Sequence, residues 1–426
     1  MLRRSVRQIQ VVALTIAFAF ALSAAPVWAQ NIESVTVGYG TLQLSGLFQA
    51  GVNYNLGDDE LAREDVDLDG DGEIAEDGSE SDIRVLNDRP VESEFVMRRV
   101  RVALKGDVMD EKVGYLFQAE FSEPEDGVRL LDARMDFAFI PYTTVNFGRF
   151  LPNFTYWQPM NKALTYTILL PQMNEFLGVQ RQTGVNVNVY HRFFELDFGA
   201  FNGRQEINAP FTPEGGMTVG ENDADTWDDE NSAKDLYVSG AIKPVPGLKL
   251  FGGYWYGRPL DYYDEDGDGE LTAHDVDVGI VDAGLAYLSD FGLSIWGEFM
   301  RQTVTFDGES PAGSKRADDF TEYVALSWYA MLAFNLNEAA GVPLEVVGRY
   351  DYLDPDSEND QDTHGYHDET QHVTAGLNYY IQSNHAMMSA NIILKDDDIE
   401  ALNKARDDTV KGVDDDVFLF QVQVWF

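Results

Sequence analysis

The feature that most restricts the fold of this chain is a two-residue period of apolar side chains, which recurs in about sixteen segments. Because successive side chains of a β-strand point to opposite faces, each such segment has one apolar and one polar face. The sequence therefore predicts an all-β protein. The period is clearest in residues 417–426, which set Phe418, Phe420, Val422, Val424 and Phe426 against Gln421 and Gln423.

Apolar and polar side chains alternate along the strands of both a soluble β-sandwich and a membrane barrel, so the alternation does not distinguish the two folds. The lengths of the connections do distinguish them. We predict strands near residues 41–50, 94–105, 112–121, 131–140, 143–150, 181–191, 194–203, 233–243, 248–257, 275–288, 292–303, 319–334, 343–352, 370–381, 385–395 and 417–426. Even-numbered connections such as 141–142 and 383–384 are short. The odd-numbered ones are long and polar, at 51–93, 151–180, 204–232, 258–274, 304–318, 353–369 and 396–416. Short periplasmic turns opposite long extracellular loops predict a transmembrane antiparallel β-barrel of about 16 strands.

The amino-terminal residues predict export. Arg3, Arg4 and Arg7 precede an apolar run at 11–22, and Val27 and Ala29 follow at the positions that a signal peptidase reads, which is the pattern of a cleaved signal peptide. We expect residues 1–29 to be removed and residues 30–426 to form a single barrel domain in the outer membrane of a Gram-negative bacterium. Loss of three arginines changes the formal charge from -43 to about -46. The sequence contains no cysteine, so disulfide and thiol chemistry are excluded.

A set of short motifs occurs in order along the chain. The motifs are RRVR at 98–101 before Gly106, YLFQAEF at 115–121, FGRF at 147–150, RQTGV at 181–185, GAFNG at 199–203, RYDYLD at 349–354 and GLNYY at 376–380. In these motifs the chain resembles the phosphate-selective porin O/P family. The resemblance implies a homotrimeric, sixteen-stranded porin in outer-membrane lipid that passes small hydrophilic solutes or ions, anions such as phosphate among them. It also implies an inward constriction loop, here about 151–180.

Strand parity identifies charged side chains that would face the lumen. The family's selectivity for phosphate depends on basic channel residues, and bidentate arginine donors can replace the water around an oxyanion. Carboxylates on the same face would instead give a compensated polar lumen. Arg98 has the opposite parity and is expected at the periplasmic rim. The inward candidates are Arg99, Arg101, Lys105, Arg134 and Arg349, with Asp132, Asp136, Glu298 and Asp351, and also Glu120 and Glu345.

Ion selectivity is left open by the sequence, between anion preference, cation preference and weak selectivity. The acidic chain repels anions from the extracellular mouth, and salt screens that repulsion. We expect weak selectivity at high salt that shifts toward cations as the salt concentration falls.

The acidic long connections, about 51–93, 204–232, 258–274, 353–369 and 396–416, contain two calcium-like motifs. Oxygen ligands at the spacing of a calcium loop, with a glycine at the turn, predict calcium as a cofactor of extracellular loops. A solvated acidic loop is the alternative. The first motif offers Asp264, Asp266, Asp268, Glu270 and Asp275, and the second, in two overlapping registers, Asp65, Asp67, Asp69, Asp71, Glu73 and Glu76.

Passive transport is therefore the expected function. The alternative is a structural or surface-interaction barrel whose calcium-bound loops bridge envelope material. His364, His367 and His372 suggest a transition-metal site, but a hydrated loop explains them more simply. The sequence shows no catalytic triad order or zinc-helix motif, so we expect no enzyme, with barrel phospholipases a remote alternative. No nucleic-acid partner is expected.

Overall fold

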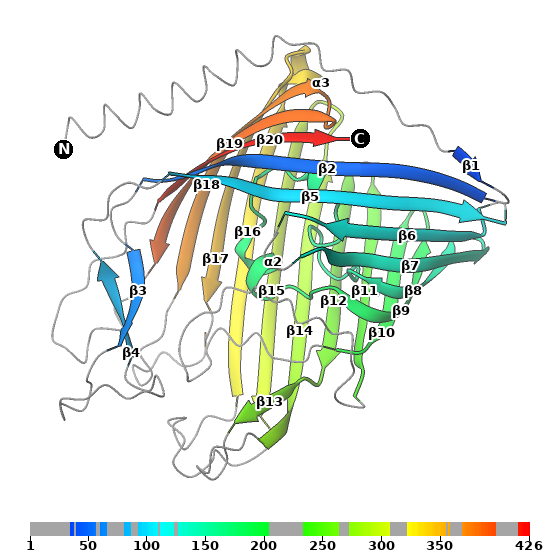
Figure 1. The fold of residues 1–426 in the computed structure, drawn as a ribbon, viewed down its shortest axis with the longest axis horizontal. Coiled ribbons are helices and arrows are strands. Elements are labelled where there is room, and N and C mark those ends of the chain that lie inside the picture. The colour runs from blue at the N-terminus through cyan, green and yellow to red at the C-terminus, as the bar shows by residue number, and fades with distance from the viewer. Residues whose placement is uncertain are drawn as a thin grey trace.

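The computed structural model describes residues 35–37, 40–56, 60–65, 81–86, 93–109, 111–122, 127–203, 233–263, 272–306, 322–354, 357, 369–397 and 416–426. Its main body is one large sheet that curves round on itself (Figure 1). The wall consists of β2 (Gly40–Asn55), β5 (Ser93–Val108), β6 (Val113–Glu120), β7 (Arg129–Ile140), β8 (Thr143–Phe150), β9 (Gln182–Tyr190), β10 (Phe194–Phe201), β11 (Asp235–Val245), β12 (Leu248–Gly257), β14 (Thr272–Leu288), β15 (Leu293–Phe306), β16 (Glu322–Asn335), β17 (Leu344–Asp354), β18 (Thr370–Gln382), β19 (Ala386–Asp397) and β20 (Val417–Trp425).

These sixteen strands form a closed antiparallel barrel. Each strand pairs with the next, and β2 pairs with both β5 and β20, which closes the ring. Closure leaves no strand edge with unpaired backbone groups, as a lipid environment requires. The predicted sixteen-stranded barrel is confirmed. Three shorter additions accompany it: β1 (Val35–Val37) beside β2, β13 (Leu260–Tyr263) beside β14, and a separate hairpin of β3 (Glu60–Asp65) and β4 (Ser81–Leu86).

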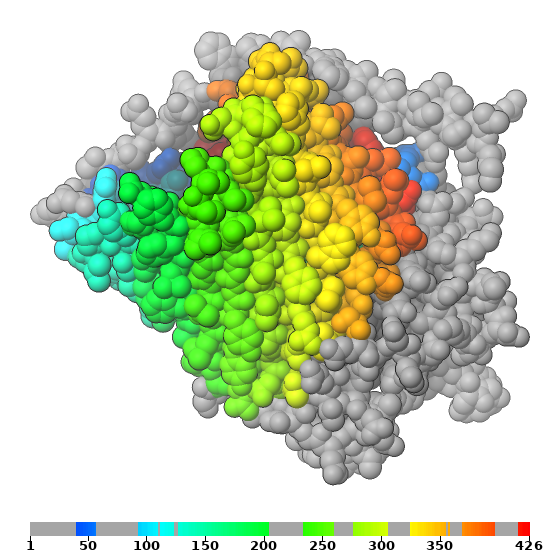
Figure 2. All heavy atoms as spheres, turned by 180° about the vertical axis from the view of Figure 1, so that it is seen from behind, coloured from blue at the N-terminus to red at the C-terminus, as the bar shows by residue number. Residues whose placement is uncertain are grey.

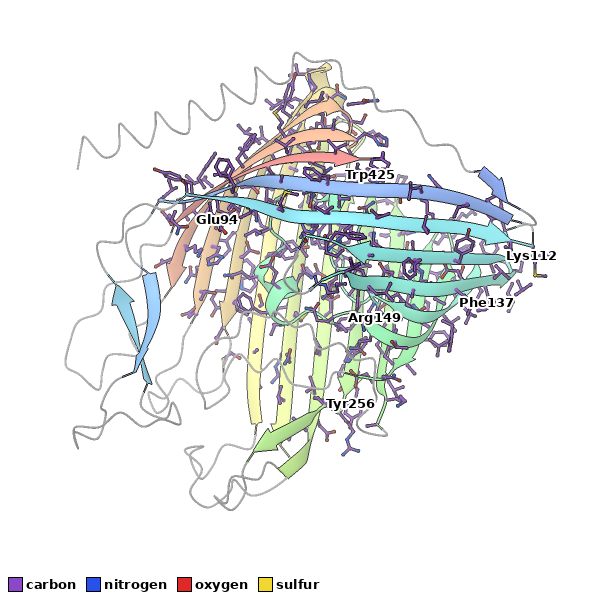
Figure 3. All side chains as sticks on the ribbon, viewed as in Figure 1. Glu94, Lys112, Phe137, Arg149, Tyr256 and Trp425 are labelled. Atoms are coloured by element: carbon purple, nitrogen blue, oxygen red, sulfur yellow. The ribbon has the colours of Figure 1, made fainter. Side chains whose placement is uncertain are left out.

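The two faces of the wall differ in the way the alternation predicts. Along β20, Gln421 and Gln423 are buried on the inner face. On β2, Leu44 and Phe48 point outward and are about two-fifths exposed. Exposed apolar side chains on a closed barrel form the lipid-facing band of a membrane protein. Figure 3 shows side chains on both faces of the strands, and Figure 2 shows part of the outer surface of the wall. In the described part of the chain, no helix is long and apolar enough to cross a membrane.

The last residue completes the seam between the first and last wall strands. The backbone N–H of Phe426 donates to the carbonyl oxygen of Gly46 at 3.0 Å, and the N–H of Gly46 donates back at 2.9 Å. A Cβ at Gly46 would lie only 2.6 Å from the Phe426 ring, so glycine leaves the space that the ring occupies. The seam therefore depends on the terminal phenylalanine and on one small residue opposite it.

A β-bulge in β5 corrects the expectation for Arg98. The pairing with β2 passes from Gln49 opposite Arg99 to Ala50 opposite Met97, so Arg98 is an extra residue without a partner on β2. A bulge shifts the alternation of its strand by one residue. The Arg98 side chain donates to Asn53 of β2, on the side of the strand nearer the long connection. Arg98 is thus beside Arg99 and not at the periplasmic rim.

Candidate functional site

Residues 151–180, called here the inner segment, connect β8 to β9 and fold into the barrel. They contain a short 3-10 helix, η1 (Lys162–Leu164), and a short α-helix, α2 (Gln172–Phe176). Figure 1 shows α2 within the ring of strands, and α2 contacts β16 and β17. The inner segment therefore decides how much of the lumen is open at this level.

One half of the inner segment is an apolar plug against the wall. Phe154 and Trp157 are each 2% exposed, and they pack against the inward side chains of β11–β17. The Trp157 ring lies 5.3 Å from that of Trp296, and the Phe154 ring lies 5.8 Å from that of Trp255. Packing of this density excludes water. The lumen is consequently filled on the side of β11–β17.

Glu298 holds the inner segment at the centre of this plug. Its two carboxylate oxygens accept the backbone N–H of Tyr156 and the hydroxyl of Tyr329, each at 2.8 Å. The indole N–H of Trp157 donates to the same hydroxyl at 2.7 Å. Glu298 faces inward as parity suggested, but it is only 3% exposed and lies beneath the inner segment. Its contacts describe an anchor and not a water-exposed channel group.

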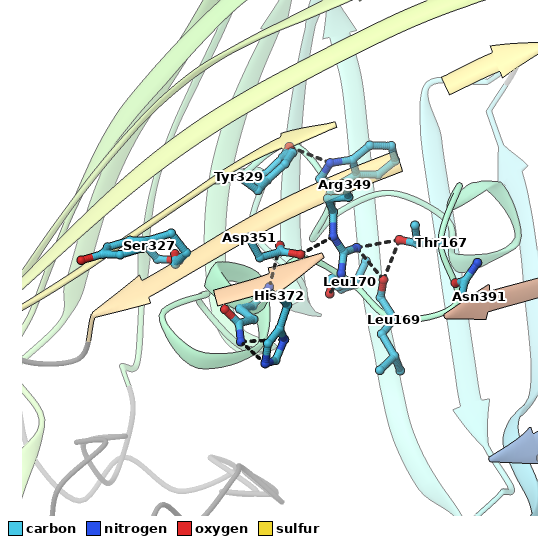
Figure 4. A network of polar contacts seen from close by, with 12 residues as sticks. Thr167, Leu169, Leu170, Ser327, Tyr329, Arg349, Asp351, His372 and Asn391 are labelled. Atoms are coloured by element: carbon cyan, nitrogen blue, oxygen red, sulfur yellow. Dashed lines mark hydrogen bonds and ion pairs between the residues drawn. The ribbon is translucent and has the colours of Figure 1, made fainter. Parts of the chain in front are cut away.

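Arg349 is a second anchor (Figure 4). Its Nε donates to the Oδ2 of Asp351 at 2.6 Å, and its Nη1 and Nη2 atoms donate to the carbonyl oxygens of Leu169 and Leu170 at 2.9 and 3.1 Å. Nη1 also donates to the hydroxyl of Thr167 at 2.6 Å. The guanidinium is thus used to bind the backbone of the inner segment. Both Arg349 and Asp351 face inward, and both are buried.

A row of wall amides fixes the rest of the inner segment. Asn378 donates to the carbonyl oxygen of Tyr166 at 2.8 Å, and Asn391 accepts the N–H of Ile168 at 2.7 Å. Gln423 donates to the carbonyl oxygen of Ala163 at 3.0 Å. Buried backbone groups need such partners because leaving one unpaired costs about 1–3 kcal/mol. The amides lie on β18, β19 and β20, so the anchoring continues round the wall toward β2.

Five cationic side chains gather where the inner segment faces β5. This basic cluster comprises Arg98, Arg99, Arg101, Lys162 and Arg181. Arg99 donates to Gln49 at 2.8 Å, and Lys162 donates to two carbonyl oxygens of its own segment, those of Trp157 and Gln158, at 3.1 and 3.2 Å. Burial, and then the charges of Arg99, Arg181 and Arg101, lower the pKa of Lys162 well below its usual range. The five cations are therefore close enough to repel one another.

Two carboxylates pair with members of the basic cluster from the wall. Glu120 lies 2.6 Å from the Nε of Arg101, and Asp132 lies 3.3 Å from the Nε of Arg181. The side chains of Arg101 and Arg181 remain 13% and 21% exposed, so both retain contact with water inside the barrel. The basic cluster can thus meet a solute, whereas Glu298 and Arg349 lie under the inner segment.

The remaining predicted channel residues lie outside the basic cluster. Arg134 and Asp136 form an ion pair at 3.0 Å on the inner face of β7 and are about one quarter exposed. Lys105 is exposed near the turn between β5 and β6, the end of the barrel marked by Lys112 in Figure 3. Arg181 was not among the predicted inward residues, although the predicted strand at 181–191 begins with it; in the structure it directly precedes β9.

The predicted calcium ligands lie outside the residues whose side chains are described. Asp65 and Asp275 fall within β3 and β14, but only their backbone is placed. Calcium binding by these loops stays a prediction. Among the described residues, no group of three or more histidine, aspartate or glutamate side chains is arranged for a metal. Of the three candidate histidines, His372 is described, and its ring contacts the amide of Gln172 at 2.8 Å.

Comparisons with known proteins agree with this architecture. Residues 292–426 match the family model of phosphate-selective porin O and P. The motifs at 349–354 and 376–380 lie within that match, and the earlier ones lie outside it. No curated protein is similar to this chain in sequence.

Three solved structures share the fold. The outer-membrane channel DcaP of Acinetobacter baumannii has a TM-score of 0.57 at 14% identity, with 91% of this chain and 97% of that chain covered. An anion-selective porin from Comamonas acidovorans has a TM-score of 0.54 at 14% identity, covering 91% and 100%. A trimer form of OmpT, an outer-membrane protein of Vibrio cholerae, has a TM-score of 0.54 at 12% identity, also covering 91% and 100%.

Proposed function

Since residues 292–426 match the family model of phosphate-selective porin O and P and the whole barrel has the fold of an outer-membrane porin, we propose that this protein is a passive channel for small hydrophilic anions. Solutes pass between the inner segment and strands β5–β8. The observation that carries the proposal is the basic cluster, which lies beside the inner segment and is in part exposed to water within the lumen.

The chemistry of the basic cluster suits an oxyanion. Guanidinium groups present several N–H donors in a fixed plane, and those of Arg99 and Arg101 come from alternate residues of one strand. A channel must bind its solute firmly enough to admit it and weakly enough to release it. Here Glu120 and Asp132 offset part of the positive charge, which favours brief binding. Chloride and inorganic phosphate both carry the negative charge that this arrangement attracts.

The acidic loops set the salt dependence. Seventy-three acidic residues against thirty basic ones give the chain a strong negative field, which opposes the entry of anions. The screening length is about 3 Å at 1 M salt and about 10 Å at 0.1 M. The basic cluster therefore acts alone at high salt, and the loops oppose it at low salt. We expect an anion preference that weakens as salt is removed.

Planar bilayer recording tests the proposed function. We expect the purified protein to insert, to conduct, and to give a reversal potential of anion sign across a potassium chloride gradient at high salt. The same gradient at tenfold lower salt should give a smaller anion preference. A protein that stays monodisperse without detergent would refute the membrane barrel itself. A protein that inserts without conducting would refute the channel and favour the surface-interaction barrel.

The charge of Lys162 should make the anion preference depend on pH. A lysine carries its positive charge only at pH values below its pKa. Because the pKa of Lys162 is lowered, Lys162 loses its charge at a lower pH than an ordinary lysine, whose pKa is about 10.4. The anion preference should therefore fall as pH rises into the alkaline range. In Lys162→Arg the cation persists, so the preference should stay constant over that range. Equal pH responses of the two proteins would exclude Lys162 as the source.

Export by a signal peptide at residues 1–29 and assembly into a homotrimer belong to the same proposal. The trimer form of the Vibrio cholerae protein supports the second. Mass determination of the mature protein and its oligomer in detergent tests both. A non-catalytic role agrees with the porin fold and stays a prediction.

A further inference from the structure

We propose that Glu175 is the residue that limits anion affinity in the constriction, as a built-in carboxylate that competes with permeant anions for the basic cluster. The inference rests on the proposed function. It concerns a residue that neither strand parity nor the family match identifies, because Glu175 lies in α2 of the inner segment. Its support comes from the placement of α2, from the exposure of the side chain and from the charges around it.

The helix α2 is held rigidly, so the place of its side chains is fixed. Met173 is fully buried, and the Asn174 side chain donates to the hydroxyl of Thr155 at 3.0 Å. The backbone N–H of Gln172 donates to Asp351 of β17 at 3.3 Å. Glu175 follows directly and is exposed, although the three residues before it are buried. An exposed carboxylate on a segment enclosed by the barrel faces the water of the lumen.

Most of the cations that act on the Glu175 carboxylate belong to the basic cluster, although Arg349 of β17 has the largest effect. Arg98, Arg99 and Lys162 all interact electrostatically with its carboxylate. Arg349 does so as well, but its guanidinium is already bound to Asp351 and to three groups of the inner segment. Glu175 therefore affects permeation through Arg98, Arg99 and Lys162, which are also cations that a permeant anion meets.

Glu175 differs from the two wall carboxylates in its freedom to exchange partners. Glu120 and Asp132 are 2% and 7% exposed, and each is paired with an arginine of the basic cluster. Glu175 is exposed and interacts with several cations of the cluster, so it can share them with a passing anion. Without it, the basic cluster would keep a larger positive charge, and an anion would bind more tightly and leave more slowly.

The test is Glu175→Gln, which removes the charge and keeps the shape. In a water-filled constriction, one unit charge at this range changes the ratio of anion to cation concentration by about two- to five-fold. We expect the anion-to-cation permeability ratio at 0.1 M salt to rise by that factor, and to rise less at 1 M. Inorganic phosphate, added to a chloride solution, should block the chloride current of Glu175→Gln at lower concentrations than that of the wild type.

Two controls separate this role from a general loss of charge. Asp136→Asn removes a partly exposed inward carboxylate that is paired with Arg134 outside the basic cluster, and it should raise the ratio less than Glu175→Gln does. Glu175→Asp should behave like the wild type. Unchanged selectivity and phosphate block in a conducting Glu175→Gln channel would overturn the inference alone. Absence of conductance in the wild type would instead overturn the proposed function.

Discussion

Replacing Arg349 with methionine is expected to release the inner segment and to give larger, fluctuating single-channel currents. The substitution leaves the buried carboxylate of Asp351 without its cation and takes donors from the carbonyl oxygens of Leu169 and Leu170. Breaking one partner of a buried ion pair costs about 3–5 kcal/mol. Movement of the inner segment toward the lumen relieves that cost, because water can then reach Asp351. The equilibrium should shift toward release by about two to four orders of magnitude.

Trypsin provides a second measurement of the same event. Lys162 is half-buried and bound to carbonyl oxygens, so cleavage there requires release of the inner segment. Arg349→Met should be cut at Lys162, and Lys243→Met should not, because Lys243 pairs with Glu195 at 2.6 Å. Adding Asp351→Leu to Arg349→Met should restore thermal stability without restoring the anchor. Wild-type currents and protection in Arg349→Met would show that the apolar plug holds the segment alone.

The second large effect is expected for the double substitution Arg99→Ala with Arg101→Ala. Two of the five cations of the basic cluster are lost, and each contributes about a two- to five-fold factor to the local ratio of anion to cation concentration. The anion-to-cation permeability ratio should therefore fall by about four- to 25-fold at 0.1 M salt. Reversal potentials across a potassium chloride gradient give this ratio directly.

Loss of Arg101 also leaves Glu120 buried without its cation, so the effect on selectivity has to be separated from one on folding. Adding Glu120→Gln removes that buried charge and should bring back normal heat-modified mobility on gels. The matched control is Lys105→Ala with Arg134→Ala, which removes two inward cations outside the basic cluster. If both pairs change the ratio equally, total lumen charge and not the basic cluster sets the selectivity.

The barrel could be predicted from the sequence because its two main signals are local. Alternation depends on neighbouring residues, and connection lengths can be counted without knowing any contact. Both signals survive in strands such as β20, where Gln421 and Gln423 line the inside. A β-bulge is harder to recognise in a sequence, but the bulge in β5 changes which alternate residues point outward. The outward residues change from odd, at Phe95 and Met97, to even, at Val102 and Leu104.

The candidate site could be predicted only in part. Strand parity indicates which face of the wall a side chain lies on, but it does not indicate whether another segment covers that side chain. Arg101 and Glu298 both point inward, but one meets water and the other lies under the inner segment. Lys162 and Glu175 belong to a segment without strand periodicity, so no pattern placed them beside β5. Their positions follow from contacts between residues far apart in the chain, which a single sequence does not reveal.

The apolar plug has a consequence for attempts to widen this pore by shortening its loops. The inner face of the wall carries Trp255, Trp296 and Met331, each 2% exposed with the inner segment in place. Exposing a large apolar side chain to water costs about 1.5–3 kcal/mol. Deleting residues 151–180 would thus give an open barrel whose inner wall has an exposed apolar strip, which would bind detergent, lipid tails or another chain. An engineered wide pore would therefore need these apolar residues replaced by polar ones, in addition to the deletion.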